Sequence, residues 1–210
     1  MIKILIADDH TTVRTGLKQI LVEEADVSEV GEARNAHEAI DLVRSRRWDL
    51  VVTDISMPGR GGLELLKEIK SEQPKLPVLV LSMHPEEQYA VRALKAGASG
   101  YMSKEAASDE LVKAVRKILR GGRYISDSVA DLLAADIGEE AGRPRYETLS
   151  DREYQVMIMI ASGKAVSDIA AELALSVKTI STYRARVLEK MGMKNNAELT
   201  HYAIQNRLVE

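Results

Sequence analysis

The sequence contains no cysteine, and this absence excludes several kinds of chemistry at once. Disulfide bonds, metal sites with thiolate ligands and catalysis by a cysteine nucleophile all need that residue. No apolar run approaches the ~18 residues that cross a bilayer, and the start of the sequence lacks the long apolar segment of a signal peptide. We therefore expect a cytoplasmic protein that has no membrane partner.

The chain also lacks an excess of charge of either sign, with 29 basic and 32 acidic side chains among 210 residues. Overall charge therefore gives no argument for nucleic acid or a membrane surface as a partner. The charge is uneven along the chain, because residues 126–147 hold 2 basic and 6 acidic side chains. This acidic connector separates two nearly neutral parts.

The composition of the connector indicates a domain boundary. Residues 138–146 show no apolar periodicity and combine glycine, proline and charges of both signs, which is typical of a linker. Before them, residues 126–128 offer two serines and an aspartate that can cap a short helix. We predict a first domain at 1–122, a linker with room for this helix at 123–146, and a second domain at 147–210.

The first domain alternates between short β-branched apolar runs and amphipathic helical patterns. Five strands alternating with five helices predict an α/β fold, a parallel sheet covered on both faces. We expect the flavodoxin-like strand order 2-1-3-4-5. Its switch point, where the strand order reverses, lies between the first and third strands. The expected strands are 2–7, 27–33, 50–54, 77–82 and 98–102. The first helix is expected to be capped by Thr11 or Thr12. The other expected helices are 36–46, 62–72, 85–96 and 108–120.

Polar side chains follow these strands where each one ends. Asp8 and Asp9 follow the first strand, Asp54 ends the third, Ser82 ends the fourth and Lys104 follows the fifth. Carboxyl ends of parallel strands meet at one edge of the sheet, so we expect these side chains to lie together. Three carboxylates there repel one another, and Mg²⁺ relieves this because it prefers oxygen ligands. Lysine and serine add a charge and a donor for a phosphoryl oxygen.

With the turn Met57-Pro58-Gly59, and with Tyr101 three residues before Lys104, this pattern resembles the receiver domain of two-component response regulators. The resemblance covers residues 1–122. It implies that Asp54 is the nucleophile that takes a phosphoryl group from a phosphohistidine on a sensor histidine kinase.

The resemblance also assigns roles to the residues around Asp54. Asp9, Asp54 and the carbonyl of Ser56 would bind Mg²⁺ directly, and Asp8 would act through water. Lys104 would hold a phosphoryl oxygen, so that Asp54, Lys104 and Ser82 form the catalytic set. Ser82 and Tyr101 would be the switch residues, the first drawn toward the phosphoryl group and the second turning inward. Many receivers follow the lysine with a cis proline, whereas this chain has Glu105, which leaves the geometry of that peptide bond open.

The second domain shows helical patterns alone, which predicts a small all-α unit of four helices. Ser150 with Glu153, Ser176, and Asn195 with Glu198 are the expected starts of the first, third and fourth helices. The second and third helices are joined by a tight turn at 174–175, so they form a helix-turn-helix whose later helix is positioned for the DNA major groove. The predicted inner stripe of that helix is Val177, Ile180, Val187, Leu188 and Met191.

The third helix is basic on its outer side, with five basic residues and one acidic residue from Lys178 to Lys194. Such a local excess suits contacts to DNA phosphates. A solvated basic helix in an ordinary helical bundle is the alternative, and periodicity alone does not decide between them.

Three segments, 149–153, 169–173 and 176–183, resemble the LuxR-type output domain of NarL/FixJ regulators. The resemblance implies a DNA-binding role. Lys178 and Thr182 are the expected base contacts, and Ser181 lies beside them where family members often carry lysine or asparagine. The expected phosphate contacts are Thr179, Tyr183, Arg184, Arg186 and Lys190.

We therefore interpret the chain as a phosphorylation-controlled transcription factor that binds double-stranded DNA and forms a homodimer when phosphorylated or DNA-bound. It is expected to catalyse only its own phosphorylation and dephosphorylation, and so not to be an enzyme. A Mg²⁺-dependent phosphohydrolase is one alternative, but Ser56 stands where such enzymes have a second aspartate and no cap domain is evident. A second alternative is a DNA-binding protein whose receiver serves only for dimerisation. The presence of all three acidic residues, Asp8, Asp9 and Asp54, argues against this alternative.

Overall fold

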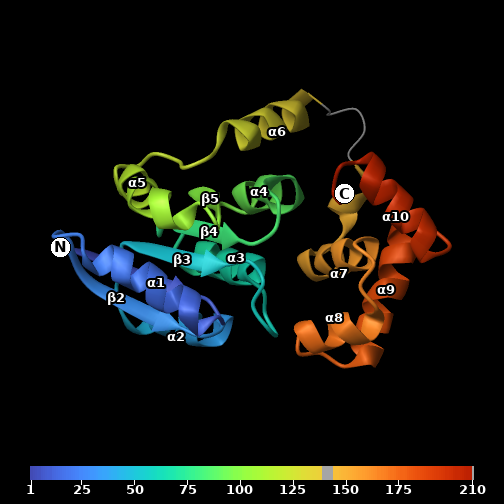
Figure 1. Cartoon of the computed structure of the whole chain (residues 1–210), viewed down its shortest axis with the longest axis horizontal. Coiled ribbons are helices and arrows are strands. Elements are labelled where there is room, and N and C mark those ends of the chain that lie inside the picture. Colours follow the sequence, from blue (N-terminus) through green and yellow to red (C-terminus); the bar gives the residue numbers. More distant parts are fainter. Residues whose placement is uncertain (139–143, 210) are drawn as a thin grey trace. The chain divides into compact units, whose positions relative to one another are not determined.

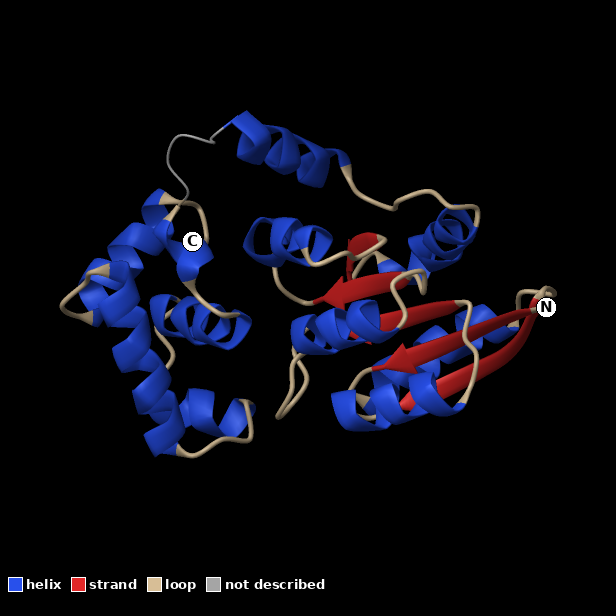
Figure 2. Cartoon of the chain, turned by 180° about the vertical axis from the view of Figure 1, so that it is seen from behind, coloured by secondary structure: helices blue, strands red, loops and turns tan. Residues whose placement is uncertain are grey.

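The computed structural model describes residues 1–138 and 144–209, so that residues 139–143 of the predicted linker lie outside the described part. It contains two compact units, Met1–Asp131 and Leu132–Glu210. The division falls inside helix α6 (Asp127–Gly138), a helix that the sequence predicted. The predicted domain limits after residues 122 and 146 stay predictions. Every strand among the described residues belongs to the first unit (Figure 2).

The first unit is built on a five-stranded parallel sheet in the order β2-β1-β3-β4-β5, which confirms the predicted topology. Thr53 pairs with Ala7, Asp54 with Leu81, and Ser82 with Ser103, so the strands end level with one another. The polar residues that follow them therefore meet at one edge. The strands are β1 (Ile2–Ala7), β2 (Val27–Ala33), β3 (Leu50–Asp54), β4 (Val78–Ser82) and β5 (Gly100–Ser103).

Helices cover both faces of this sheet (Figure 1). On one face α1 and α5 pack together over buried strand residues such as Ile4, Val52 and Leu79. Alternate strand residues such as Leu5 and Val51 point to the other face and are also fully buried. A sheet buried on both sides explains why its strands are continuous apolar runs. The helices are α1 (Thr11–Val22), α2 (Ala36–Ser45), α3 (Gly62–Glu72), α4 (Glu86–Lys95) and α5 (Ala107–Leu119).

Several predicted boundaries in this unit differ from the structure, and two of the differences have a clear local cause. Helix α1 begins at Thr11 itself, and His10 takes the N-cap position without a side-chain cap. The reason is that Asp8 accepts the His10 N–H at 2.8 Å, which turns the chain earlier than a threonine cap would. Strand β5 begins at Gly100 instead of Ala98, because the Ala98 N–H still closes α4 by donating to the Ala93 carbonyl.

The second unit consists of helices, as predicted, with one added 3₁₀ turn, η1 (Arg145–Thr148). The side chains of Ser150, Ser176 and Asn195 each accept the backbone N–H three residues on, which confirms these helix starts. Gly192 ends α9 with a φ of 65°, a left-handed conformation that glycine adopts without strain. The four main helices are α7 (Asp151–Ala161), α8 (Val166–Glu172), α9 (Val177–Met191) and α10 (Asn196–Gln205).

Helix α7 lies at the centre of this unit, with α9 and α10 packed on it and α8 packed on α9. Ile180, Val187 and Met191 are buried as the predicted inner stripe requires, and Leu188 is half-buried. Val177 was placed in this stripe wrongly, since 54% of it is exposed. A helical side chain covers the turn that precedes it, and Val177 starts its helix, so it has no such turn to cover. In the part of the chain described here, no helix has the length and apolar composition needed to cross a bilayer.

Candidate functional sites

An acid cluster, formed by Asp8, Asp9 and Asp54, lies at the carboxyl edge of the sheet. Together with His10, these residues place one ligand atom each within 4.8 Å of one another. Asp8 and Asp54 are buried, and Asp9 is half-buried. The sheet brings the residues together because β1 and β3 are neighbours and end at the same level.

Lys104 places its ammonium group inside this cluster. Its Nζ lies 2.6 Å from Asp8 Oδ2 and 2.8 Å from Asp54 Oδ2, and only 5% of the side chain is exposed. Burial raises the pKa of Asp54 above its ordinary value, although Lys104 opposes this shift. Burial by itself lowers the pKa of Lys104, but the two carboxylates outweigh it and raise that pKa. The peptide bond to Glu105 is trans, as are all others in the described residues.

The two predicted switch residues are also at this edge, and both are fully buried. The Ser82 hydroxyl accepts the His84 N–H at 2.9 Å, and the Ser82 carbonyl accepts the Lys104 N–H at 2.8 Å. The second bond ties the end of β4 to the residue that carries the ammonium group. Tyr101 lies in the adjacent strand β5 with its ring inside the unit.

Ser56 is joined to the cluster through its backbone and to a neighbouring loop through its side chain. Its N–H donates to Asp54 Oδ1 at 3.2 Å, and its Oγ lies 2.9 Å from His84 Nε2. The His84 ring in turn packs against the ring of Tyr89, with 5.2 Å between centroids. The loops after β3 and β4 are thus hydrogen-bonded to each other beside the acid cluster.

Sequence reasoning missed His10, Arg14 and His84. His10 Nδ1 lies 3.0 Å from Asp9 Oδ1, and the buried Arg14 donates from Nη1 to the Asp8 carbonyl at 2.7 Å. For His10, adjacency to the two aspartates was an available signal. For Arg14, the signal was its position one turn into the helix that begins beside them.

The arrangement suits a divalent cation and a phosphoryl group. Three carboxylates within 4.8 Å of one another carry more negative charge than one ammonium neutralises. Burial raises the pKa of Asp54, and the neighbouring charge of Asp8 raises it further. Hard oxygen donors of this kind favour Mg²⁺, which binds through one or two carboxylates and leaves positions for phosphate oxygens.

The second site is the helix-turn-helix formed by α8 and α9. Ala174 turns the chain with a φ of 52°, and the Leu175 N–H donates back to the Ala170 carbonyl at 2.9 Å. The Ser176 side chain then accepts the Thr179 N–H at 3.0 Å and starts α9. The predicted turn and cap are therefore present.

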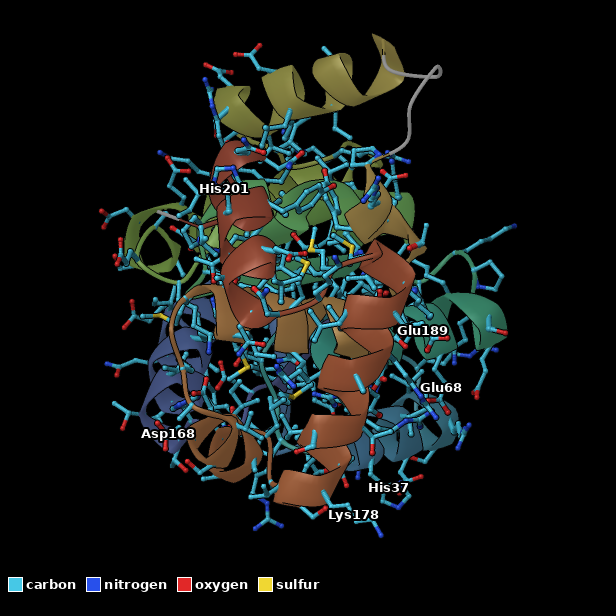
Figure 3. All side chains as sticks on the ribbon, turned by 90° about the vertical axis from the view of Figure 1, so that its right-hand side faces the viewer. His37, Glu68, Asp168, Lys178, Glu189 and His201 are labelled. Atoms are coloured by element: carbon cyan, nitrogen blue, oxygen red, sulfur yellow. The ribbon has the colours of Figure 1, made fainter. Side chains whose placement is uncertain are left out.

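The outer side of α9 is exposed along its whole length. Figure 3 labels Lys178 near the start of this helix and Glu189 near its end. The Thr182 and Ser181 hydroxyls donate to carbonyls of their own helix, which leaves their lone pairs as acceptors. The exposed outer residues are Lys178, Ser181, Thr182, Ala185, Arg186 and Glu189, as the helical period predicts.

Four other predicted DNA contacts are half-buried or already paired within the unit. Thr179 and Tyr183 are half-buried. The half-buried Arg184 donates from Nε to Asn196 Oδ1 at 2.6 Å, so that it ties α9 to α10. Lys190 Nζ lies 2.6 Å from the buried carboxylate of Glu153 in α7. The assignment of these four residues to DNA phosphates stays a prediction.

Comparison with known proteins identifies both units. Residues 4–116 match the model of the family described as response regulator receiver domain, and residues 147–203 match that of bacterial regulatory proteins of the luxR family. The response regulator UvrY of Escherichia coli strain K12 is 38% identical over 209 residues, which cover 99% of this chain and 96% of UvrY. The response regulator GacA of Pseudomonas aeruginosa is 37% identical over 211 residues, which cover 100% and 99% of the two chains.

Solved structures of RcsB, a response regulator of Salmonella, are similar to this chain as well. One RcsB structure has a TM-score of 0.63 at 30% identity and covers 97% of this chain and 100% of its own. Another, bound to the promoter rprA in the presence of the phosphomimetic BeF₃⁻, has a TM-score of 0.64 at 29% identity and covers 96% and 98%.

A doubly wound receiver unit with an acid cluster, followed by a helix-turn-helix unit, defines a response regulator with a LuxR-type DNA-binding domain. Within that class, the chain belongs to the NarL/FixJ family.

Proposed function

We propose that Asp54 accepts a phosphoryl group from a sensor histidine kinase in a Mg²⁺-dependent reaction, and that this controls DNA binding by the second unit. The observation that carries the proposal is the position of Asp54 Oδ2, 2.8 Å from Lys104 Nζ and inside the acid cluster. A nucleophile, a fixed positive charge and a set of cation ligands are what phosphoryl transfer needs.

In the transfer, an oxygen of the Asp54 carboxylate forms a bond to phosphorus while the P–N bond to the kinase histidine breaks. Lys104 stabilises negative charge on a phosphoryl oxygen, and the Ser82 hydroxyl donates to another. Asp9, Asp54 and the Ser56 carbonyl would hold Mg²⁺, with Asp8 beside them, and a bound cation would neutralise charge on the phosphoryl oxygens.

The output is contact with double-stranded DNA through the outer side of α9. Lys178 and Thr182 are our candidates for base contacts, and the exposed Arg186 is our candidate for a phosphate contact. The description of one RcsB structure as two dimers bound to two parallel DNAs supports a homodimer as the DNA-bound form. Two copies would place two recognition helices on paired half-sites.

We further propose that the protein is not an enzyme toward external substrates and acts in the cytoplasm. It catalyses its own phosphorylation and dephosphorylation, because its acid cluster serves a bound aspartyl phosphate. Ser56 supports this view, since its hydroxyl is engaged with His84 and is too weakly acidic to act as the second aspartate of a phosphohydrolase.

Mass spectrometry after incubation with acetyl phosphate and Mg²⁺ tests the acceptor. We expect one phosphoryl group per chain, and none in the Asp54→Ala variant or after chelation of Mg²⁺. Uptake of a phosphoryl group by Asp54→Ala would refute the assignment. Duplex DNA binding by the phosphorylated and unphosphorylated protein, measured at one salt concentration, tests the coupling of the two units.

A further inference from the structure

The segment that follows α5 runs back to the sheet before it enters α6. The Tyr124 N–H donates to the Ser99 carbonyl at 3.0 Å, and the Tyr101 N–H donates to the Tyr124 carbonyl at 3.1 Å. Gly100 leaves space for this pairing, because a Cβ there would lie 2.7 Å from the Tyr124 carbonyl oxygen. The chain just before α6 is therefore tied to β5, the strand that contains Tyr101 and leads to Lys104.

The start of α6 is held by Glu86, the first residue of α4. Ser126 Oγ donates to Glu86 Oε2 at 2.5 Å, and Ser128 Oγ donates to the same oxygen. Ser126 also caps α6, because its Oγ accepts the Val129 N–H at 3.2 Å, and Val129 is fully buried. Hydrogen bonds to a carboxylate are stronger than those between neutral groups. Glu86 thus fastens the first turn of α6 to the first turn of α4.

Glu86 is connected to the acid cluster by a short series of contacts. The Ser56 N–H donates to Asp54 Oδ1, and the Ser56 hydroxyl is bonded to the His84 ring at 2.9 Å. The His84 N–H donates to Ser82 Oγ at 2.9 Å. One residue, Pro85, separates His84 from Glu86, and its ring restricts φ, so little slack remains between them.

We propose that Glu86 is the docking residue for the linker helix α6, and that phosphorylation of Asp54 loosens this contact. The release step rests on the function proposed above. When Ser82 turns its hydroxyl toward a phosphoryl oxygen, it moves the acceptor of the His84 N–H, and the phosphorylated Asp54 oxygens reposition the Ser56 N–H. Both changes act on the loop that leads through Pro85 to Glu86.

The hydrogen bonds from Ser126 and Ser128 to Glu86, which we call the latch, can break and form again. Glu86 and Ser126 are half-buried and Ser128 is exposed, so water can replace the two hydroxyl donors when the carboxylate shifts. Residues 124 and 101 remain paired, which keeps the chain attached while the first turn of α6 becomes free to move. The next residues of α6 carry the chain across the boundary between the two units, after Asp131.

Amide hydrogen exchange in the full-length protein tests the latch. The Val129 and Ala130 N–H groups are the reporters, because they donate to the Ser126 hydroxyl and carbonyl. We expect phosphorylation with acetyl phosphate and Mg²⁺ to speed their exchange about tenfold, a typical size for coupling between sites. Mass spectrometry of the same samples establishes that the phosphoryl group is present.

Two variants weaken the latch, one by removing a donor and the other by removing the acceptor. Ser128→Ala removes one donor and keeps the Ser126 cap, and Glu86→Ala removes the acceptor. Each is expected to speed exchange at Val129 and Ala130 without phosphorylation and to shrink the effect of phosphorylation. The double variant should go little further than Glu86→Ala alone, since that change already removes the acceptor of the Ser128 hydroxyl. Asp131→Ala, at an exposed position of α6, is the matched control and should leave both measurements unchanged.

The possible failures are distinguishable. A phosphorylated protein whose Val129 and Ala130 amides exchange at the unphosphorylated rate overturns the release step. If the effects of Ser128→Ala and Glu86→Ala on amide exchange simply add, the docking role of Glu86 is overturned. This holds with or without phosphorylation. A protein that gains no phosphoryl mass instead overturns the proposed function and, with it, the release step.

Discussion

Lys104 and Asp54 form a buried ion pair, with 2.8 Å between Nζ and Oδ2. The same ammonium is shared with Asp8 at 2.6 Å, so one positive charge faces two buried negative ones. Burial raises the pKa of Asp54, and without the ammonium the charged carboxylate would be less stable still. The pair therefore favours the charged form of Asp54, and in the proposed transfer the same ammonium would lie next to the incoming phosphoryl group.

Replacing Lys104 by methionine should lower the rate of phosphoryl uptake from acetyl phosphate about 10²- to 10³-fold, the usual loss when one electrostatic donor is removed. Lys104→Arg should restore part of the rate, because it restores the charge but not the point geometry. The rate is measured by mass spectrometry at saturating Mg²⁺. Lys113→Met, at an exposed position of α5, is the control. Unchanged uptake by Lys104→Met would remove this residue from the site.

Gly62, the first residue of α3, tests how closely the chain must approach Asp54. A Cβ at this position would lie 1.9 Å from the Asp54 carbonyl oxygen, so Gly62→Ala forces the backbone apart. We expect a loss of about 1–3 kcal/mol in the free energy of unfolding, as for other overpacked sites, and slower phosphoryl uptake. Denaturant unfolding measures the free energy of unfolding, and mass spectrometry measures the phosphoryl uptake.

Gly16 in α1 provides the matched control, because a Cβ there meets nothing within 4 Å. Gly16→Ala should raise the free energy of unfolding by about 1 kcal/mol through helix propensity alone. Equal effects of the two substitutions would show that the contact with Asp54 is not what requires glycine at position 62.

Glu153 makes the stability of the second unit depend on pH. Burial by itself would raise its pKa, but Lys190 and the Ser150 N–H together hold the pKa of Glu153 below its ordinary value of 4.5. The unfolded chain therefore binds this proton first as the pH falls. Its stabilising contribution is complete above about 4.5 and is lost as the pH falls through the lower pKa of the folded state.

Glu153→Gln should therefore weaken the acid dependence of unfolding, measured by denaturant titrations of the full chain from neutral pH to pH 3. The variant should be less stable at neutral pH, where the ion pair with Lys190 exists, and closer to the wild type in acid. An identical acid dependence in both proteins would contradict this role of Glu153.

Arg186 and Lys190 should differ in their contribution to DNA binding. Arg186 is exposed on the outer side of α9, whereas Lys190 is paired with Glu153 at 2.6 Å. Arg186→Met should reduce the slope of log affinity against log salt by about one, the value for one lost phosphate contact. Lys190→Met should change this slope less and lower stability more, because it leaves a buried carboxylate without its partner. Equal slope changes would place both cationic side chains on DNA phosphates.

Much of the fold followed from local patterns. The β-branched run before Asp54, the apolar stripes of the helices and the serines and asparagine that start α7, α9 and α10 act over a few residues, and they are present as predicted. The errors also have local causes: His10 replaced a threonine cap because Asp8 captured its N–H, and Val177 is exposed because it begins its helix. The gathering of Asp8, Asp9, Asp54 and Lys104 was predictable because parallel strands end at a common edge.

The sequence by itself determined the two architectures, their strands and helices and the residues that follow each strand, because hydrophobic periodicity and turn chemistry depend on near neighbours. Only the tertiary structure decided which polar groups meet across distant segments. Ser56 with His84, Glu86 with Ser126 and Lys190 with Glu153 are joined by hydrogen bonds between residues 28, 40 and 37 positions apart. Such pairs depend on the path of each loop and the rotation of each helix, which no local pattern encodes.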